Sequence, residues 1–208
     1  MTKYYALAAS AAVIALLAGT YAVTRMTASD DAFAACRAGQ TAGGAIGGPF
    51  ELVDDTGATV TDADVITGPT LIYFGYTFCP DVCPLDVQRN AQAVEILEED
   101  GIEVTPVFIS IDPERDTVEV VRDFTDNFHD RMIGLTGTPE QVRAASQAYR
   151  TYYAKQDTDD EYYLVDHSVL SYLVFPEHGF QEFYRREVTP EDMAESVACF
   201  AEAAERSG

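Results

Sequence analysis

The sequence is poor in basic residues. It contains 13 lysines and arginines against 35 aspartates and glutamates, which gives a formal net charge of −22 over 208 residues. Because such a charge repels phosphate backbones, it argues against nucleic acid as a partner. Acidic runs of this kind are ordinarily solvated loops and helix ends. The surface therefore suits a soluble, exported domain.

Histidine and cysteine are also scarce, with three and four copies, and the chain shows no internal repeat. Apolar side chains are not scarce, since 47% of the residues are hydrophobic and 12 tyrosines and 11 phenylalanines are present. This composition is sufficient for a core and excludes bulk disorder. The length suits one domain with appendages.

One long apolar run lies near the N-terminus, from Ala6 to Val23, between Lys3 and Arg25. As a helix with a rise of 1.5 Å per residue, the run spans roughly 27 Å. We expect residues 1–25 to be an uncleaved, single-pass anchor in the inner membrane, with the domain outside in the periplasm. A cleaved signal peptide is the alternative, because residues 32–34 (Ala-Phe-Ala) resemble a cleavage site.

Residues 26–46 are rich in Ala, Gly, Ser and Thr, which predicts a flexible linker that does not pack. The folded domain is expected over residues 47–208. Its pattern predicts a β-hairpin, then β, α, β, α, short β, α, β, β, α. The expected strands are 50–53, 58–60, 70–76, 104–111, 132–135, 162–165, 169–175 and 180–184. The expected helices start at 83, 118, 138 and 189 and reach about 101, 129, 153 and 204.

A βαβ half followed by a ββα half, with cysteines at the first βα turn, is typical of an α/β thioredoxin-like fold. The helix between the halves and the N-terminal β-hairpin are extensions of that fold. Apolar strands joined by a helical crossover favour a parallel core.

Two cysteines, Cys79 and Cys83, follow the apolar strand 70–76 at the start of a helical pattern. A separation of four residues places their Cα atoms about 6 Å apart, within disulfide range. Pro84 suits a first helical position, so we place the helix start at Cys83 and Cys79 in the loop before it. Because helix-end amides stabilise an anion, at least Cys83 should have a depressed pKa.

Thiol–disulfide enzymes of this fold normally carry two residues between their cysteines, whereas this chain has three. A metal site is the other interpretation, and His167 is the best third ligand because it lies where two late strands meet beside the cysteine turn. Two sulfurs and one imidazole suit three-coordinate copper(I) and fall short of structural zinc. Copper(II) would need a further ligand or water. Alternatively, His167 only caps a strand.

Four stretches of the chain resemble the Sco (SenC) copper-chaperone family. They are residues 73–84 (YFGYTFCPDVCP), 108–117 (FISIDPERDT), 134–137 (GLTG) and 165–168 (VDHS). The resemblance implies a thioredoxin-like domain that binds copper through Cys79, Cys83 and His167. It also implies that the copper goes to the binuclear site of cytochrome c oxidase subunit II, directly or together with thiol reduction of that subunit.

Four further residues are candidates for supporting roles. Asp81 could tune the site, although a solvated turn residue is the simpler interpretation. Asp166 could orient His167, although strand alternation would point it away from the metal. Cys36 and Cys199 make an even pair outside the motif, which predicts a structural disulfide in an oxidising compartment. Free thiols, or an intermolecular bridge through Cys36, are the alternatives.

The leading hypothesis is therefore a membrane-anchored copper carrier rather than an enzyme. The competing hypothesis is a thiol–disulfide oxidoreductase in which Cys79 attacks, Cys83 resolves and His167 is dispensable. A thiol peroxidase has no specific signal in the sequence beyond the fold.

Overall fold

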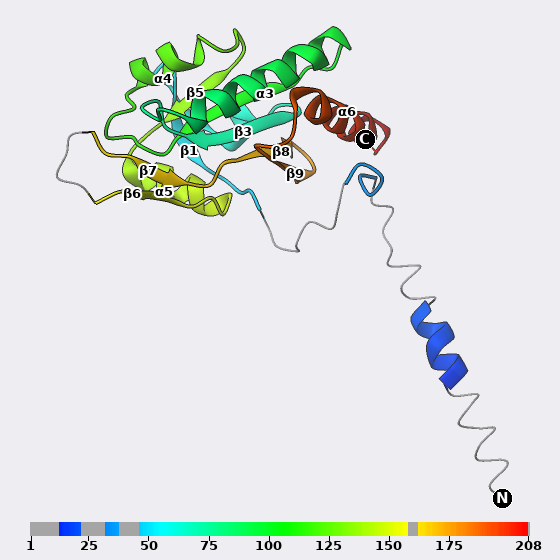
Figure 1. The fold of residues 1–208 in the computed structure, drawn as a ribbon. Helices are drawn as coiled ribbons and strands as arrows, with labels where there is room; N and C mark the ends of the chain where they lie inside the picture. Colours follow the sequence, from blue (N-terminus) through cyan, green and yellow to red (C-terminus); the bar gives the residue numbers. More distant parts are fainter. Residues whose placement is uncertain (1–12, 22–31, 38–45, 158–161, 208) are drawn as a thin grey trace, which may run out of the picture.

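The computed structural model describes residues 13–21, 32–37, 46–157 and 162–207 (Figure 1). The strands are β1 (Glu51–Asp54), β2 (Thr59–Thr61), β3 (Thr70–Gly75), β4 (Thr105–Ser110), β5 (Ile133–Thr136), β6 (Tyr153–Lys155), β7 (Val165–His167), β8 (Leu170–Phe175) and β9 (Gly179–Arg185). The helices after the first strands are α2 (Asp62–Val65), α3 (Val82–Glu99), α4 (Val118–Thr125), α5 (Pro139–Ala148) and α6 (Pro190–Ser207).

The described residues form a seven-stranded sheet in the order β2-β1-β5-β4-β3-β8-β9. Strands β3, β4 and β5 run parallel, and β1 and β8 flank them in the antiparallel direction. The parallel core and the β1–β2 hairpin confirm the sequence-based expectation of an α/β thioredoxin-like arrangement. The parallel strands are apolar along their length because both faces of the sheet are covered.

Strand β3 contributes residues to two hydrophobic clusters. Leu71 packs with Leu173 and with apolar residues of α3 and α6, whereas Ile72 belongs to the cluster that contains Cys83 and Tyr172. Leu71 and Ile72 point to opposite faces of the sheet because successive side chains of a strand alternate. In Figure 1, α3 and α6 lie side by side along the sheet, in agreement with their contacts.

Three predicted boundaries are wrong by three residues or more. The helix expected to reach residue 153 ends at Ala148, because Arg150 adopts a left-handed φ of 52° and reverses the chain. The helix expected to reach residue 129 ends at Thr125, and turns with both i→i−3 and i→i−4 hydrogen bonds continue to His129. The strand expected at 162–165 is shifted to β7, which pairs with β6 in a separate two-stranded sheet.

The N-terminal expectations have mixed outcomes. Residues 13–21 are helical, and within the described ranges no helix is long and apolar enough to cross a membrane. The rest of the predicted anchor and most of the predicted linker, residues 1–12, 22–31 and 38–45, lie outside the described residues.

The described middle of the linker packs against the domain, contrary to expectation. Phe33 is 6% exposed, and its ring lies 6.0 Å from that of Phe175 and 5.8 Å from that of Phe200. Cys36 forms a disulfide with Cys199 of α6, which confirms the predicted pairing. One buried aromatic ring and one covalent bond hold a segment whose composition alone predicts no packing.

Candidate metal centre

The two motif cysteines lie where β3 ends and α3 begins. Cys79 is in the preceding loop, and Cys83 is the second residue of α3, which starts one residue earlier than predicted. Gly75 closes β3, and a Cβ atom there would lie 3.0 Å from Cys83 Sγ and 2.8 Å from the Tyr73 ring. Glycine is therefore required at this position for the helix to bring Cys83 against the strand.

Cys79, rather than Cys83, is the anionic sulfur. Cys79 Sγ accepts a hydrogen bond from the Cys83 amide at 3.4 Å. The Cys83 side chain, assisted by the amides of Cys83, Asp81 and Val82, lowers the pKa of Cys79 to about 5 despite burial. The contact with Cys79, together with burial, raises the pKa of Cys83. The expectation that Cys83 has a depressed pKa is therefore wrong, because its fully buried sulfur faces the more accessible thiolate.

His167 is the last residue of β7, and its Nε2 lies 3.4 Å from Cys83 Sγ. Its Nδ1 lies 3.1 Å from the carbonyl oxygen of Val165. Because a carbonyl only accepts, Nδ1 donates this hydrogen bond and Nε2 presents its lone pair to the thiol. The Tyr76 ring meets the imidazole edge to face at a centroid distance of 5.6 Å, which restricts ring rotation. The imidazole is therefore held in the orientation that a metal ligand needs.

The three predicted ligands form a chain of contacts rather than a finished cage. Within the described part of the chain, no group of three His, Cys, Asp or Glu side chains could hold a metal ion as it stands. However, two ligands that each lie about 2.0–2.3 Å from one ion are about 3–4 Å apart. The 3.4 Å between Cys83 Sγ and His167 Nε2 falls in this range. Soft thiolate and imidazole donors at this spacing fit copper(I).

The two acidic candidates do not reach the thiols through their carboxylates. Asp81 is an exposed residue at the N-cap of α3, and its side chain makes no capping hydrogen bond. Its backbone amide donates a hydrogen bond to Cys79 instead. The carboxylate of Asp166 accepts a hydrogen bond from Gln156 at 2.8 Å on the exposed side of the hairpin. The Val165 carbonyl occupies the position of an orienting acceptor for His167.

Buried polar side chains that sequence reasoning missed support the site. Tyr73 donates to the carboxylate of Asp86 at 3.1 Å, beneath Cys83. Asp116 accepts from the Thr77 amide at 3.1 Å and from its hydroxyl at 2.6 Å, and so holds the base of the cysteine loop. Spacing along the chain gives no signal for these pairs, since Thr77 and Asp116 are 39 residues apart.

The difference between the two thiols should be visible in alkylation of the reduced, copper-free protein. We expect iodoacetamide to modify Cys79 at a rate that rises with pH through about 5, because the thiolate is the nucleophile. Cys83 should stay unmodified at neutral pH. Peptide mass mapping across a pH series measures both rates.

A Cys83→Ala variant is the control, because it removes the main cause of the lowered Cys79 pKa. In this variant, the pH at which Cys79 is alkylated at half its maximal rate should move towards the ordinary cysteine pKa of about 8.5. Faster modification of Cys83 than of Cys79 in the wild type would contradict the assignment.

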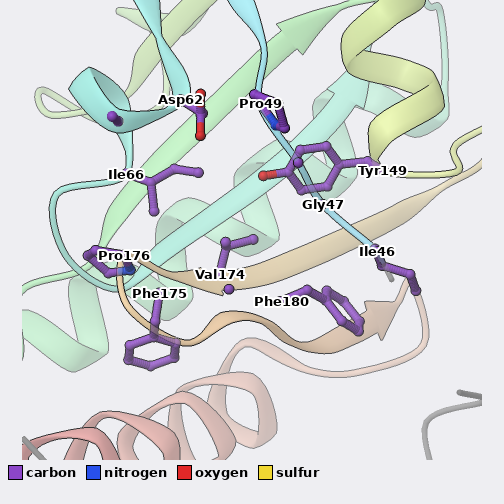
Figure 2. A pocket seen from close by; sticks show the side chains of 13 residues that line it. Ile46, Gly47, Pro49, Asp62, Ile66, Tyr149, Val174, Phe175, Pro176 and Phe180 are labelled. Carbon is purple, nitrogen blue, oxygen red and sulfur yellow. The ribbon is translucent and has the colours of Figure 1, made fainter. Parts of the chain in front are cut away.

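A cavity of about 440 Å³ lies at the other end of the central strands. Val174 in its wall pairs with Thr70, the first residue of β3, whereas the thiols adjoin Gly75, the last. Figure 2 shows Tyr149, Ile66 and Phe180 around the space. None of its lining residues is a candidate ligand, so the cavity is separate from the thiol site.

Comparison with known proteins places the chain in a family. The sequence model of the SCO1/SenC family matches residues 38–202. SenC of Rhodobacter capsulatus is 54% identical over 208 residues, which is 100% of this chain and 94% of that protein. Arabidopsis thaliana ScoI with copper bound aligns with a TM-score of 0.71 at 42% identity, covering 78% of this chain and 99% of that one. Bradyrhizobium japonicum ScoI with copper bound gives a TM-score of 0.68 at 38% identity, with coverages of 74% and 98%. The chain therefore belongs to the SCO1/SenC family.

Proposed function

We propose that this protein is a copper metallochaperone that delivers copper to the binuclear copper site of cytochrome c oxidase subunit II. The observation that carries the proposal is the contact of Cys83 Sγ with His167 Nε2 at 3.4 Å, beside the Cys79 thiolate. Copper is the cargo: copper(I) takes the three ligands, and copper(II) requires a further ligand or water. The copper-bound structures of similar ScoI proteins support this choice of metal.

Delivery requires a protein partner that reaches the ligands. The large apolar side chains that the described part of the globular domain exposes lie on the segments that carry the thiols and His167. They are Phe78, Leu85, Tyr152, Tyr162 and Leu164. An apolar surface around a metal site suits docking of another protein, within which ligands exchange one at a time. The same surface would serve the upstream copper donor.

The proposed location is the periplasmic side of the inner membrane, with residues 1–25 as a single-pass anchor. The apolar run from Ala6 to Val23 supports an anchor. The Cys36–Cys199 disulfide supports an oxidising compartment.

Thiol–disulfide exchange is the second candidate function, and the lowered pKa of Cys79 beside a buried Cys83 favours it. The Cys79 thiolate would attack a disulfide of subunit II and release one of its thiolates. Cys83 would then attack the Cys79 sulfur, release the second thiolate and close a Cys79–Cys83 disulfide. Two electrons pass to the partner, and an upstream thiol reductase restores the dithiol.

The test is a transfer assay with the complete chain in detergent. Copper(I)-loaded protein is mixed anaerobically with the reduced, copper-free soluble domain of subunit II, and the two are separated for metal analysis. We expect copper to move to the acceptor, and a Cys79→Ser/Cys83→Ser variant to carry and deliver none.

A parallel reaction mixes the copper-free protein with the disulfide form of the acceptor. Reduction of that disulfide without any copper transfer in the first reaction would overturn the chaperone proposal and favour the oxidoreductase.

A further inference from the structure

The charged loop between β4 and α4 contains a cation whose role the copper proposal does not explain. The side chain of Arg115 is only 16% exposed, although it lies in a loop. Its Nε donates to Asp112 Oδ2 at 2.5 Å, and its Nη1 donates to the carbonyl oxygen of Tyr163 at 3.0 Å. Such partners offset the cost of burying most of a guanidinium, so its placement is specific. Its Nη2 atom is buried without a hydrogen-bond partner among the described residues.

The guanidinium also lies against aromatic rings from two separate segments. Its Cζ is 3.6 Å from the centroid of the Tyr163 ring and 4.9 Å from that of Phe78. Tyr163 precedes β7, and Phe78 is the residue before Cys79. One planar cation therefore contacts both the segment that carries His167 and the loop that carries the first thiol.

The segment that carries His167 needs an anchor of this kind. β6 and β7 form a two-stranded sheet of their own, and the described residues provide no ladder between it and the seven-stranded sheet. An isolated two-stranded hairpin is at best marginally stable in water. Here β7 continues into β8 of the main sheet after two residues, and Val165 is buried in the core. The side-chain contacts of Tyr163 hold the other end of β7 beside the thiols.

Asp112 binds both Tyr163 and Arg115 through its two carboxylate oxygens. Its Oδ1 accepts the Tyr163 hydroxyl at 2.6 Å, while its Oδ2 holds the Arg115 guanidinium. Tyr163 is thus held by its hydroxyl, its ring face and its carbonyl, all from a single loop. Lysine cannot reproduce this arrangement, because it lacks the planar fork that stacks and donates in two directions.

We propose that Arg115 is a positioning residue of the metal site, which clamps the β6–β7 hairpin against the thiol loop and so sets the His167 imidazole beside Cys83. This inference rests on the proposed copper site. Without the clamp, both thiols keep their places through Gly75 and Asp116, whereas His167 loses its fixed distance from them.

The experiment compares Arg115→Lys with wild type in the complete, detergent-solubilised chain. We expect copper(I) affinity, measured by competition with a chromophoric chelator, to fall about 10–100-fold, which is the usual effect of losing a group that orients a ligand. In the copper-free protein, the amides of β7 should exchange with deuterium faster, while those of β3 do not change. The alkylation rate of Cys79 should also stay the same.

Lys155→Ala is the matched control. Its ammonium lies 3.7 Å from the same Tyr163 ring, but the side chain is 51% exposed and pairs with the exposed Glu114. Such an exposed cation contributes little, so the affinity should change less than about three-fold. If Arg115→Lys folds poorly, Tyr163→Leu replaces it in the test, because this variant removes the ring on which Arg115 stacks. We expect the same loss of copper affinity and the same faster exchange in β7.

Unchanged copper affinity and unchanged β7 exchange in Arg115→Lys would overturn the inference, as would an equal loss in Lys155→Ala. Failure of the proposed function looks different: wild type would then bind no copper, or His167→Ala would bind it as tightly as wild type. The deuterium exchange of the copper-free protein tests the clamp in either case.

Discussion

Replacing His167 by alanine is expected to weaken copper(I) binding by at least about a hundred-fold, because losing a ligand costs more than the 10–100-fold of losing a group that orients one. The imidazole nitrogen 3.4 Å from Cys83 Sγ is the third donor of a site that otherwise has two sulfurs. Thiol exchange should persist, because the backbone amides that stabilise the Cys79 thiolate come from α3 and the residue before it. Anaerobic chelator competition and a disulfide-exchange assay measure the two properties on the same sample.

His129→Ala is the matched control for this variant. His129 pairs with Glu98 at 3.3 Å, and Glu98 is 15 residues along α3 from Cys83, about 22 Å away. We expect its copper affinity to equal that of wild type. Wild-type affinity in His167→Ala would remove this residue from the site and would leave thiol exchange as the better-supported function.

Removing the Cys36–Cys199 disulfide through a Cys36→Ser/Cys199→Ser double variant is expected to lower the free energy of unfolding by about 2–5 kcal/mol. The bond joins residues 163 positions apart, so its loss releases a large part of the unfolded chain. It also frees the segment that places Phe33 between Phe175 and Phe200. Urea denaturation of the complete chain measures the change.

Copper affinity should not change in the double serine variant. Phe175 lies beyond the Thr70 end of β3, about 17–20 Å from the Gly75 end that adjoins the thiols. Figure 1 likewise shows the segment around Phe33 beside α6, on the side of the molecule away from β7. A reductant should destabilise wild type but not the variant. Equal stability of the two proteins under oxidising conditions would contradict the prediction.

Local rules predicted several element boundaries well. Thr138 and Thr189 accept capping hydrogen bonds from the amides of Gln141 and Asp192, and a proline follows each threonine at the start of α5 and α6. Gly101 follows the last turn of α3 with a φ of 78°. These signals depend on residues within one helical turn, so the sequence carries them completely.

The β6–β7 hairpin shows where local rules fail. Local rules assign its residues partly to the end of a helix and partly to a strand that begins at residue 162. The outcome depends on Arg150, whose left-handed conformation ends the helical path, and on the contacts of Tyr163 with Arg115 and Asp112. Those partners lie 48 and 51 residues from Tyr163 in the chain. Periodicity within a window of residues contains no information about such contacts.

The sequence by itself determined the apolar strands of the parallel core and the motif that identifies Cys79, Cys83 and His167 as candidates; it predicted a Cys36–Cys199 disulfide among alternatives, and the structure decided for it. These conclusions depend on residue type, on spacing along the chain and on the even number of cysteines.

Only the tertiary structure decided that Cys79 is the thiolate, that the Val165 carbonyl orients the imidazole, and that Arg115 joins the two halves of the site. A pKa and a ring orientation depend on burial and on partners in space. Those partners come together only when segments as distant as Cys83 and His167, 84 residues apart, are packed on the same end of the sheet.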